Sequence, residues 1–207
     1  MKLNILYEDE QLAVIDKEAG IAVLREGEER NTTVADLLAE QIPACKELGE
    51  EHRYGIVHRL DKDTSGVLVI AKTKEMYKYL QEQFQNRTIK KEYAALVSGI
   101  IKENTKVIDA PLKRAPSDRR KQQAVKPGTE GARDAVTEFE VIERYKGYTL
   151  LKVLPKTGRK HQIRAHLTSI HHPIAGDRLY GFKDQIIPDR LSRQFLHASS
   201  LTIPMPD

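Results

Sequence analysis

The sequence of 207 residues predicts a mixed protein of α-helices and β-strands. Short apolar or alternating runs bounded by polar turns occur about eight times, and such runs are typical of strands. Three further segments repeat apolar residues every three or four positions, as amphipathic helices do. These patterns do not order the strands. The chain is long enough to bury a core without metals or disulfides, so we expect one domain, residues 1–207.

The first segments predict a pair of strands followed by a helix. Residues 3–7 and 12–17 are strand-like, and residues 8–11, three of which are acidic, form a turn between them. Thr32 and Thr33 both suit the N-cap of a helix that we expect to end at about Gln41.

A short aliphatic run, Val67–Ala71, predicts a buried strand, although the pattern alone does not exclude a buried helical segment of this length. The pattern changes after Thr73. Met76, Leu80 and Phe84 recur every four residues and predict a helix whose apolar stripe packs into the core.

The second half of the chain is richer in strand patterns. Residues 88–99 alternate at first and then become apolar, as a strand entering a core does. Residues 136–145 and 148–154 predict a hairpin that reverses direction at Lys146-Gly147.

A strand-to-helix turn is expected at Thr157-Gly158. Ile163, Leu167 and Ile170 then fall on one face of a predicted helix. The glycine beside basic residues superficially suggests a phosphate-binding loop, but the Walker spacing of glycines and lysine is absent.

The charge of the chain is divided unevenly. Residues 1–50 hold 5 Lys or Arg and 12 Asp or Glu, whereas residues 51–207 hold 29 and 18. Within the basic part, residues 113–126 hold six bases and one acid, which predicts an exposed loop or hairpin. Such an arm can grip phosphates and become ordered on binding. Charge alone leaves RNA and DNA binding open.

Composition excludes several classes of protein. There is no apolar run of about 18 residues, so we expect no membrane span. The N-terminus lacks a signal-peptide pattern, and Cys45 is the single cysteine, so a cytoplasmic protein is expected. No two of the seven histidines have the i, i+4 spacing of a zinc hydrolase, and we expect no metal site.

The most informative stretch is His58-Arg59-Leu60-Asp61-Lys62-Asp63-Thr64-Ser65-Gly66, directly before the predicted buried strand. A carboxylate at the mouth of such a strand is partly withdrawn from water and rigidly supported, as a reactive group must be. Considered alone, Asp61 could instead cap the turn or pair with Arg59. Asp61 and Asp63 could also begin an acidic nuclease site, but no third acidic ligand is apparent.

The complete string resembles the signature of the RluA-type pseudouridine synthases, His-Arg-Leu-Asp-x-x-Thr-Ser-Gly. Further matches are the Lys-x-Tyr-x-Ala around Tyr93, the Thr-Gly-Arg-x-His-Gln-Ile-Arg-x-His-Leu of residues 157–167, and residues 174–181 and 196–198. The resemblance covers about residues 3–203. One departure is Glu18, which stands where the family usually has proline.

The resemblance implies an α+β pseudouridine synthase fold: a mixed, mostly antiparallel sheet with flanking helices and a central RNA-binding cleft. It implies an isomerase that flips a uridine out of its RNA and rejoins the base through carbon 5, without a cofactor. Asp61 is then the catalytic carboxylate, Tyr93 lies against the base, and Arg164 pairs with Asp61. In this family, the arginine matching Arg59 can fill the space that the base leaves.

The same resemblance implies an RNA partner, either ribosomal RNA or a transfer RNA stem-loop, with no DNA or membrane partner and a monomeric enzyme. We expect no separate N-terminal RNA-binding domain. The alternative is a non-catalytic RNA-binding or ribosome-assembly protein. The residues expected to contact RNA are His58, Arg59, Thr64, Arg114, Arg119, Arg120, Lys121, Arg159 and Lys160.

Overall fold

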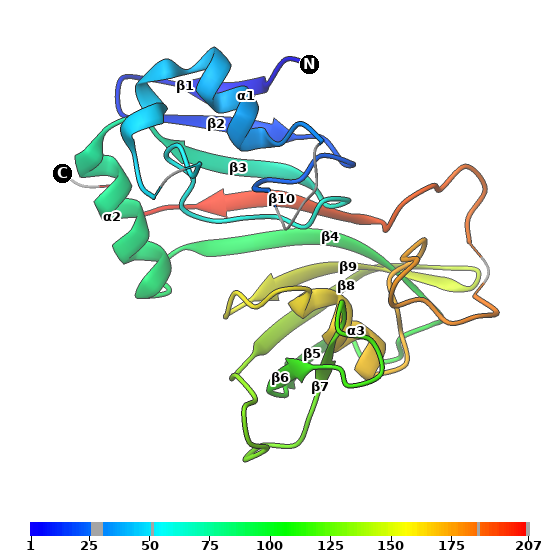
Figure 1. Cartoon of the computed structure of the whole chain (residues 1–207). Coiled ribbons are helices and arrows are strands. Elements are labelled where there is room, and N and C mark those ends of the chain that lie inside the picture. The colour runs from blue at the N-terminus through cyan, green and yellow to red at the C-terminus, as the bar shows by residue number, and fades with distance from the viewer. Residues whose placement is uncertain (26–30, 51, 186, 206–207) are drawn as a thin grey trace. The chain divides into compact units, whose positions relative to one another are not determined.

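The chain divides into two units in the computed structural model, which describes residues 1–25, 31–50, 52–185 and 187–205. The first unit comprises Met1–Ile89 and Ser200–Asp207, and the second comprises Lys90–Ser199. Both units combine strands with helices (Figure 1). The predicted α+β class is therefore confirmed, with mostly antiparallel strand pairs.

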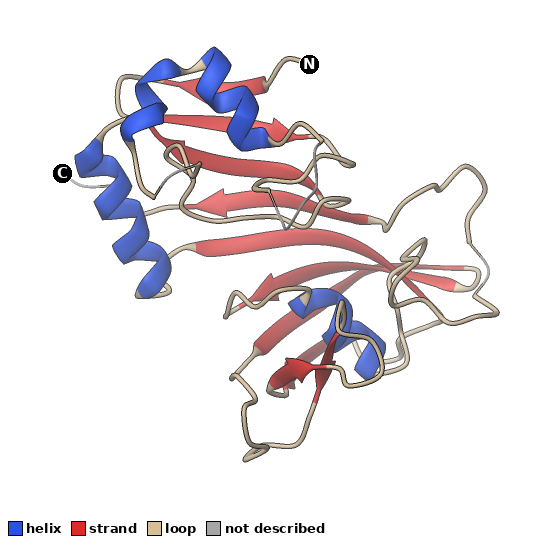
Figure 2. Ribbon diagram, viewed as in Figure 1, coloured by secondary structure: helices blue, strands red, loops and turns tan. Residues whose placement is uncertain are grey.

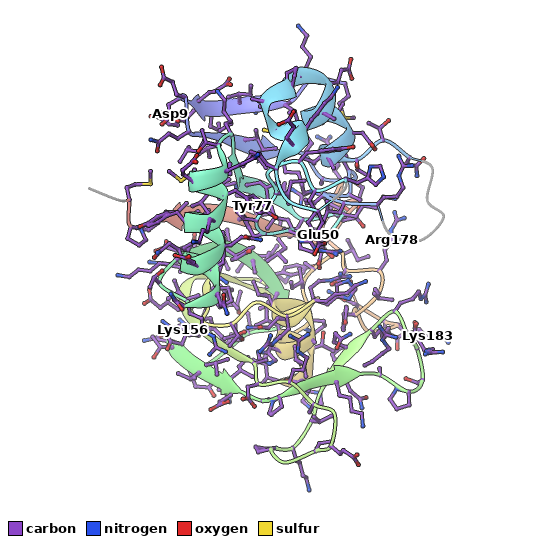
Figure 3. The ribbon with its side chains drawn as sticks, turned by 60° about the vertical axis from the view of Figure 1, so that its left-hand side comes forward. Asp9, Glu50, Tyr77, Lys156, Arg178 and Lys183 are labelled. Atoms are coloured by element: carbon purple, nitrogen blue, oxygen red, sulfur yellow. The ribbon has the colours of Figure 1, made fainter. Side chains whose placement is uncertain are left out.

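The first unit is built on three antiparallel strands that lie side by side in the order β1 (Asn4–Glu8), β2 (Leu12–Lys17) and β3 (Ser65–Ala71). Asp9, labelled in Figure 3, closes the turn between β1 and β2, because its carboxylate accepts the N–H groups of Gln11 and Leu12 at 2.8 Å each.

Side-chain caps set where the helices of this unit begin. Thr33 caps α1 (Val34–Gln41) and forms a capping box with Asp36, which selects it over Thr32. Thr73 caps α2 (Lys74–Gln85) by accepting the N–H of Met76. A 3-10 helix, η1 (Pro43–Glu47), follows α1. The apolar stripe of α2 packs against β2 and β3 as its spacing predicts, through Leu12, Val69, Ala71, Met76 and Leu80.

Four strands of the second unit lie side by side, and each neighbouring pair is antiparallel. β4 (Lys90–Ser98) pairs with β9 (Tyr148–Pro155), β9 pairs with β8 (Val136–Tyr145), and β8 pairs with β5 (Thr105–Asp109). The predicted hairpin of residues 136–154 is thus confirmed. The buried core of this sheet and α3 (Gln162–Ser169) includes Ala95, Val97, Phe139, Leu151, Val153, Ile163 and Leu167.

The basic segment forms a second small sheet, the hairpin of β6 (Leu112–Arg114) and β7 (Gln122–Ala124). This result decides between the loop and the hairpin that the sequence left open. The hairpin lies beside α3 (Figure 2). The last strand, β10 (Leu196–Thr202), belongs to the second unit up to Ser199 and to the first from Ser200.

Among the described residues there are ten strands, against the roughly eight that the sequence suggests. In the same residues, no helix has both the length and the hydropathy of a membrane span. Nor do those residues place three His, Cys, Asp or Glu side chains together as a metal site would require.

Candidate active site

Asp61 opens a tight turn that leads directly into β3. Its backbone carbonyl accepts the N–H of Thr64 at 3.0 Å, and Thr64 is 2% exposed. The Asp61 side chain is half-buried, while the next residues in the turn, Lys62 and Asp63, are exposed. The motif therefore presents one partly withdrawn carboxylate at the end of a strand whose residues from Leu68 on are buried.

The turn is fixed to β2 by Lys17, a lysine with only 2% of its surface exposed. Its ammonium donates to the carbonyls of Glu18 at 2.7 Å, Ile21 at 2.9 Å and Lys62 at 3.0 Å. The Lys62 carbonyl also accepts the N–H of Gly20 at 2.9 Å, and Gly20 adopts a φ of +90°, which favours glycine. Because Lys62 directly follows Asp61, these bonds hold the backbone that carries the carboxylate.

His58 is held by contacts with the protein itself. Its ring stacks on Phe84 of α2 with a centroid distance of 4.6 Å, and Nε2 accepts the N–H of Val69 at 3.1 Å. Nε2 must therefore lack a proton in this arrangement. These contacts anchor the chain three residues before Asp61, whereas Arg59 is exposed.

In the second unit, Tyr93 lies on β4 opposite Val153 of β9. The ring is half-buried and packs at the margin of the core formed by the sheet and α3. A tyrosine in this place is held by the strand backbone and keeps part of its ring accessible, which suits contact with a nucleobase.

Arg164 lies on α3 with 7% of its surface exposed, and it forms a buried ion pair with Asp177. Nε of Arg164 donates to Asp177 Oδ2 at 2.7 Å, and Nη2 donates to Oδ1 at 2.9 Å. Gly176, the residue directly before Asp177, has a φ of +75°, and a Cβ there would lie 2.2 Å from the Arg193 carbonyl oxygen. Because glycine allows this close backbone contact, Asp177 lies beside the Arg164 guanidinium.

A chain of buried hydrogen bonds seats α3 on the sheet. Thr157 Oγ1 donates to Gln162 Oε1 at 2.7 Å, and Gln162 Nε2 donates to Thr137 Oγ1 at 3.0 Å. Thr137 in turn bonds to Nδ1 of His166 at 2.8 Å, while Nε2 of His166 lies 2.9 Å from the carbonyl of Ala110. Since that carbonyl only accepts, Nε2 carries the proton and Nδ1 accepts from Thr137.

Burial lowers the pKa of His166 below its usual 6.5, because the charged form loses its hydration. The neutral ring completes the hydrogen-bond chain. The three polar residues Thr157, Gln162 and His166 of the predicted motif therefore support α3, the element that carries Arg164.

The basic hairpin presents its charges at and beside its tip. Arg114, Arg119 and Arg120 are exposed, and Lys121 is half-buried. Arg120 pairs with Asp118 at 2.8 Å, and its hydrogen bonds hold the pKa of Asp118 at about 2. Nearer to α3, Arg159 donates to the carbonyl of Asp134 at 3.0 Å, and Lys160 is exposed.

The predicted catalytic residues fall in both units, Asp61 in the first and Tyr93 and Arg164 in the second. The pairing of Asp61 with Arg164 stays a prediction. Asp177 is the partner of Arg164 that residue-by-residue reasoning missed. Asp177 belongs to the Gly-Asp-x-x-Tyr-Gly pattern of residues 176–181, which forms part of the family resemblance but does not by itself imply a role for this residue.

Comparison with known proteins agrees with these motifs. A family model described as RNA pseudouridylate synthase matches residues 11–169. The ribosomal large subunit pseudouridine synthase D of Nitrosomonas europaea is 43% identical over 99% of this chain and 58% of its own length. A protein of Aquifex aeolicus, named as an uncharacterized RNA pseudouridine synthase, is 44% identical over 91% of this chain and 59% of its own length.

A solved structure, human RNA pseudouridylate synthase domain containing 1, superposes with a TM-score of 0.80 at 28% identity, covering 98% of this chain and 79% of that one. The chain spans less than two thirds of the length of the two bacterial relatives above. The family match covers most of the chain and includes Asp61, Tyr93 and Arg164. The chain belongs to the RNA pseudouridylate synthase family.

Proposed function

We propose that this protein is an RNA pseudouridine synthase that isomerises specific uridines in RNA. The observation that carries the proposal is the presentation of Asp61: a half-buried carboxylate in a turn held by the buried Lys17 at the start of β3. A binding protein has no need of an acid on such a support, since a carboxylate repels phosphates. The family match and the names of the relatives support the same activity.

The reaction breaks the bond between uracil nitrogen 1 and ribose carbon 1′, and forms a bond between carbon 5 and carbon 1′. Carbon 5 loses a proton and nitrogen 1 gains one, so the product is an isomer and nothing is oxidised. An ionised carboxylate stabilises the positive charge that develops on the sugar, or bonds covalently to the substrate, as carboxylates do in glycosidases. We assign this role to Asp61.

Two further catalytic roles follow from the resemblance. Tyr93 holds the uracil while it turns, and Arg164 orients the Asp61 carboxylate. Reaching the base requires that it leave its stack, at a cost of a few kcal/mol. The exposed Arg59 offsets part of that cost by occupying the vacated space.

Most of the remaining residues of the RNA-binding set act on the phosphate backbone. The exposed arginines of the basic hairpin and the exposed Lys160 suit phosphate contacts, because several bases on one arm release counterions together. His58 and Thr64 act by supporting the motif turn.

We propose a monomeric enzyme whose single catalytic domain is residues 1–207, acting without a cofactor or metal in the cytoplasm. Large-subunit ribosomal RNA is the first substrate to test, because relatives carry that name.

The experiment is release of tritium from RNA that contains uridine labelled at carbon 5. Ribosomal RNA and transfer RNA transcripts are incubated with the protein, with and without a chelator. We expect release from at least one class of transcript, and no effect of the chelator. RNA binding with no release from either class would instead support the non-catalytic alternative. Modified positions are then mapped in a strain lacking the gene, with and without complementation.

A further inference from the structure

Tyr180 lies between the basic hairpin and Arg164 and contacts both. It is 5% exposed and belongs to the turn that follows Asp177. Its hydroxyl accepts the backbone N–H of Gln122 in β7 at 2.6 Å, and Lys121 Nζ lies 5.8 Å from its ring centroid. On the α3 side, Cζ of Arg164 lies 4.9 Å from the same centroid.

Asp177 makes Tyr180 and Arg164 parts of one rigid group. The carboxylate that binds the guanidinium twice also accepts the N–H of Leu179 at 2.9 Å and the N–H of Tyr180 at 3.0 Å. A guanidinium bound through two of its nitrogens to one carboxylate and faced by an aromatic ring has little rotational freedom. The orientation of Arg164 therefore depends on the turn that holds the ring.

The hydroxyl and the ring of Tyr180 perform separable tasks. The hydroxyl docks the hairpin at the first residue of β7, and it also lies 3.1 Å from Nδ1 of His161, the residue before α3. The strands β6 and β7 are only three residues long, so their own ladder gives the hairpin little stability. A docked hairpin presents its arginines to RNA already ordered, which saves the entropy of ordering them on binding.

We propose that Tyr180 is a positioning residue that couples RNA engagement by the basic hairpin to the orientation of Arg164. Its hydroxyl sets how well the hairpin captures RNA, and its ring sets how well Arg164 acts. The proposal rests on the proposed synthase activity. It adds a connection between substrate capture and the catalytic arginine within the second unit.

The coupling predicts different kinetic defects for two substitutions. Tyr180→Phe removes the hydroxyl and keeps the ring. KM for RNA therefore rises about five- to tenfold, as expected for loss of the hydroxyl's hydrogen bond to the hairpin, while kcat stays near the wild-type value because the ring still faces Arg164. Tyr180→Leu removes both, so kcat falls in addition to the rise in KM. Tyr145→Phe is the matched control, because Tyr145 is 43% exposed on β8 and its hydroxyl donates to the carboxylate of Glu143 two residues away.

Limited trypsin digestion supplies a readout that does not depend on activity. Cleavage after Arg119 and Arg120 at the hairpin tip is several-fold faster in Tyr180→Phe than in the wild type, because the undocked hairpin opens more often. Circular dichroism verifies that each variant is folded. Should Tyr180→Leu fail to fold, Tyr180→Phe still decides the question by KM and cleavage rate.

Two outcomes would overturn the coupling and are distinguishable. Wild-type KM, kcat and cleavage rate in Tyr180→Phe, with an active wild type, would refute the coupling while leaving the synthase activity intact. A wild type that binds RNA without releasing tritium would remove the proposed function and the catalytic half of the coupling together, even if the hairpin of Tyr180→Phe is cut faster.

Discussion

Thr137→Val tests whether the buried hydrogen-bond chain under α3 stabilises the second unit. Thr137 is 0% exposed, and its hydroxyl joins Gln162 Nε2 at 3.0 Å to His166 Nδ1 at 2.8 Å. Valine has nearly the same shape, so packing is kept while two buried polar atoms lose this partner. Each such atom costs about 1–3 kcal/mol when left unsatisfied. Gln162 keeps its bond to the Val136 carbonyl, which places its loss at the lower end.

The expected total is a loss of about 3 kcal/mol of unfolding free energy. In a chain of this size that corresponds to a fall in Tm of about 6–12 °C. Urea denaturation followed by circular dichroism measures the free energy, and thermal melting checks it. Thr105→Val, the same substitution at an exposed position of β5, is the control and should change stability by less than about 0.5 kcal/mol. A loss below about 1 kcal/mol for Thr137→Val would show that this hydrogen-bond chain contributes little to the stability of the second unit.

Three other predictions concern α3 and its partners. Because burial lowers the pKa of His166, the unfolded state takes up a proton at a higher pH than the folded state does. The free energy of unfolding should therefore fall as the pH drops below about 6.5, and it should level off below the pKa of the folded state. Urea midpoints measured between pH 8 and pH 5 should show this fall, and the fall should be smaller in His166→Gln. Asp177→Asn removes the negative charge that binds the buried Arg164 guanidinium twice and should cost about 3–5 kcal/mol in urea denaturation, and a change under about 1 kcal/mol would contradict the importance of the pair. Arg164→Ala should reduce the rate of tritium release more than RNA affinity in filter binding, whereas unchanged turnover would move its role to another residue.

Features encoded by neighbouring residues were predictable from the sequence. Local capping chemistry predicts the start of α2 at Thr73 and narrows the start of α1 to Thr32 or Thr33, and the apolar stripe of α2 follows from its four-residue spacing. The buried strand β3 and the β8–β9 hairpin were likewise predicted from short-range patterns. The candidate site was found because its motifs are contiguous strings of residues.

Features that depend on distant partners were not predictable. β5 has the polar sequence Thr-Lys-Val-Ile-Asp, and only its pairing with β8 makes it a strand. Asp177 is 13 residues from Arg164 in a loop, and no periodicity connects the two. Thr137 and Gln162 are 25 residues apart, and the sequence gives no sign that a strand threonine bonds to a helix glutamine.

A comparison of two isosteric substitutions in one turn tests whether the Asp61 carboxylate performs the chemistry. Asp61→Asn and Asp63→Asn each remove one negative charge from the turn between Asp61 and Thr64. Asp63 is the exposed member of the pair. Tritium release and RNA binding are measured for both. We expect that Asp61→Asn abolishes release while RNA affinity stays within a few-fold, and that Asp63→Asn keeps both. Substantial release by Asp61→Asn would contradict it.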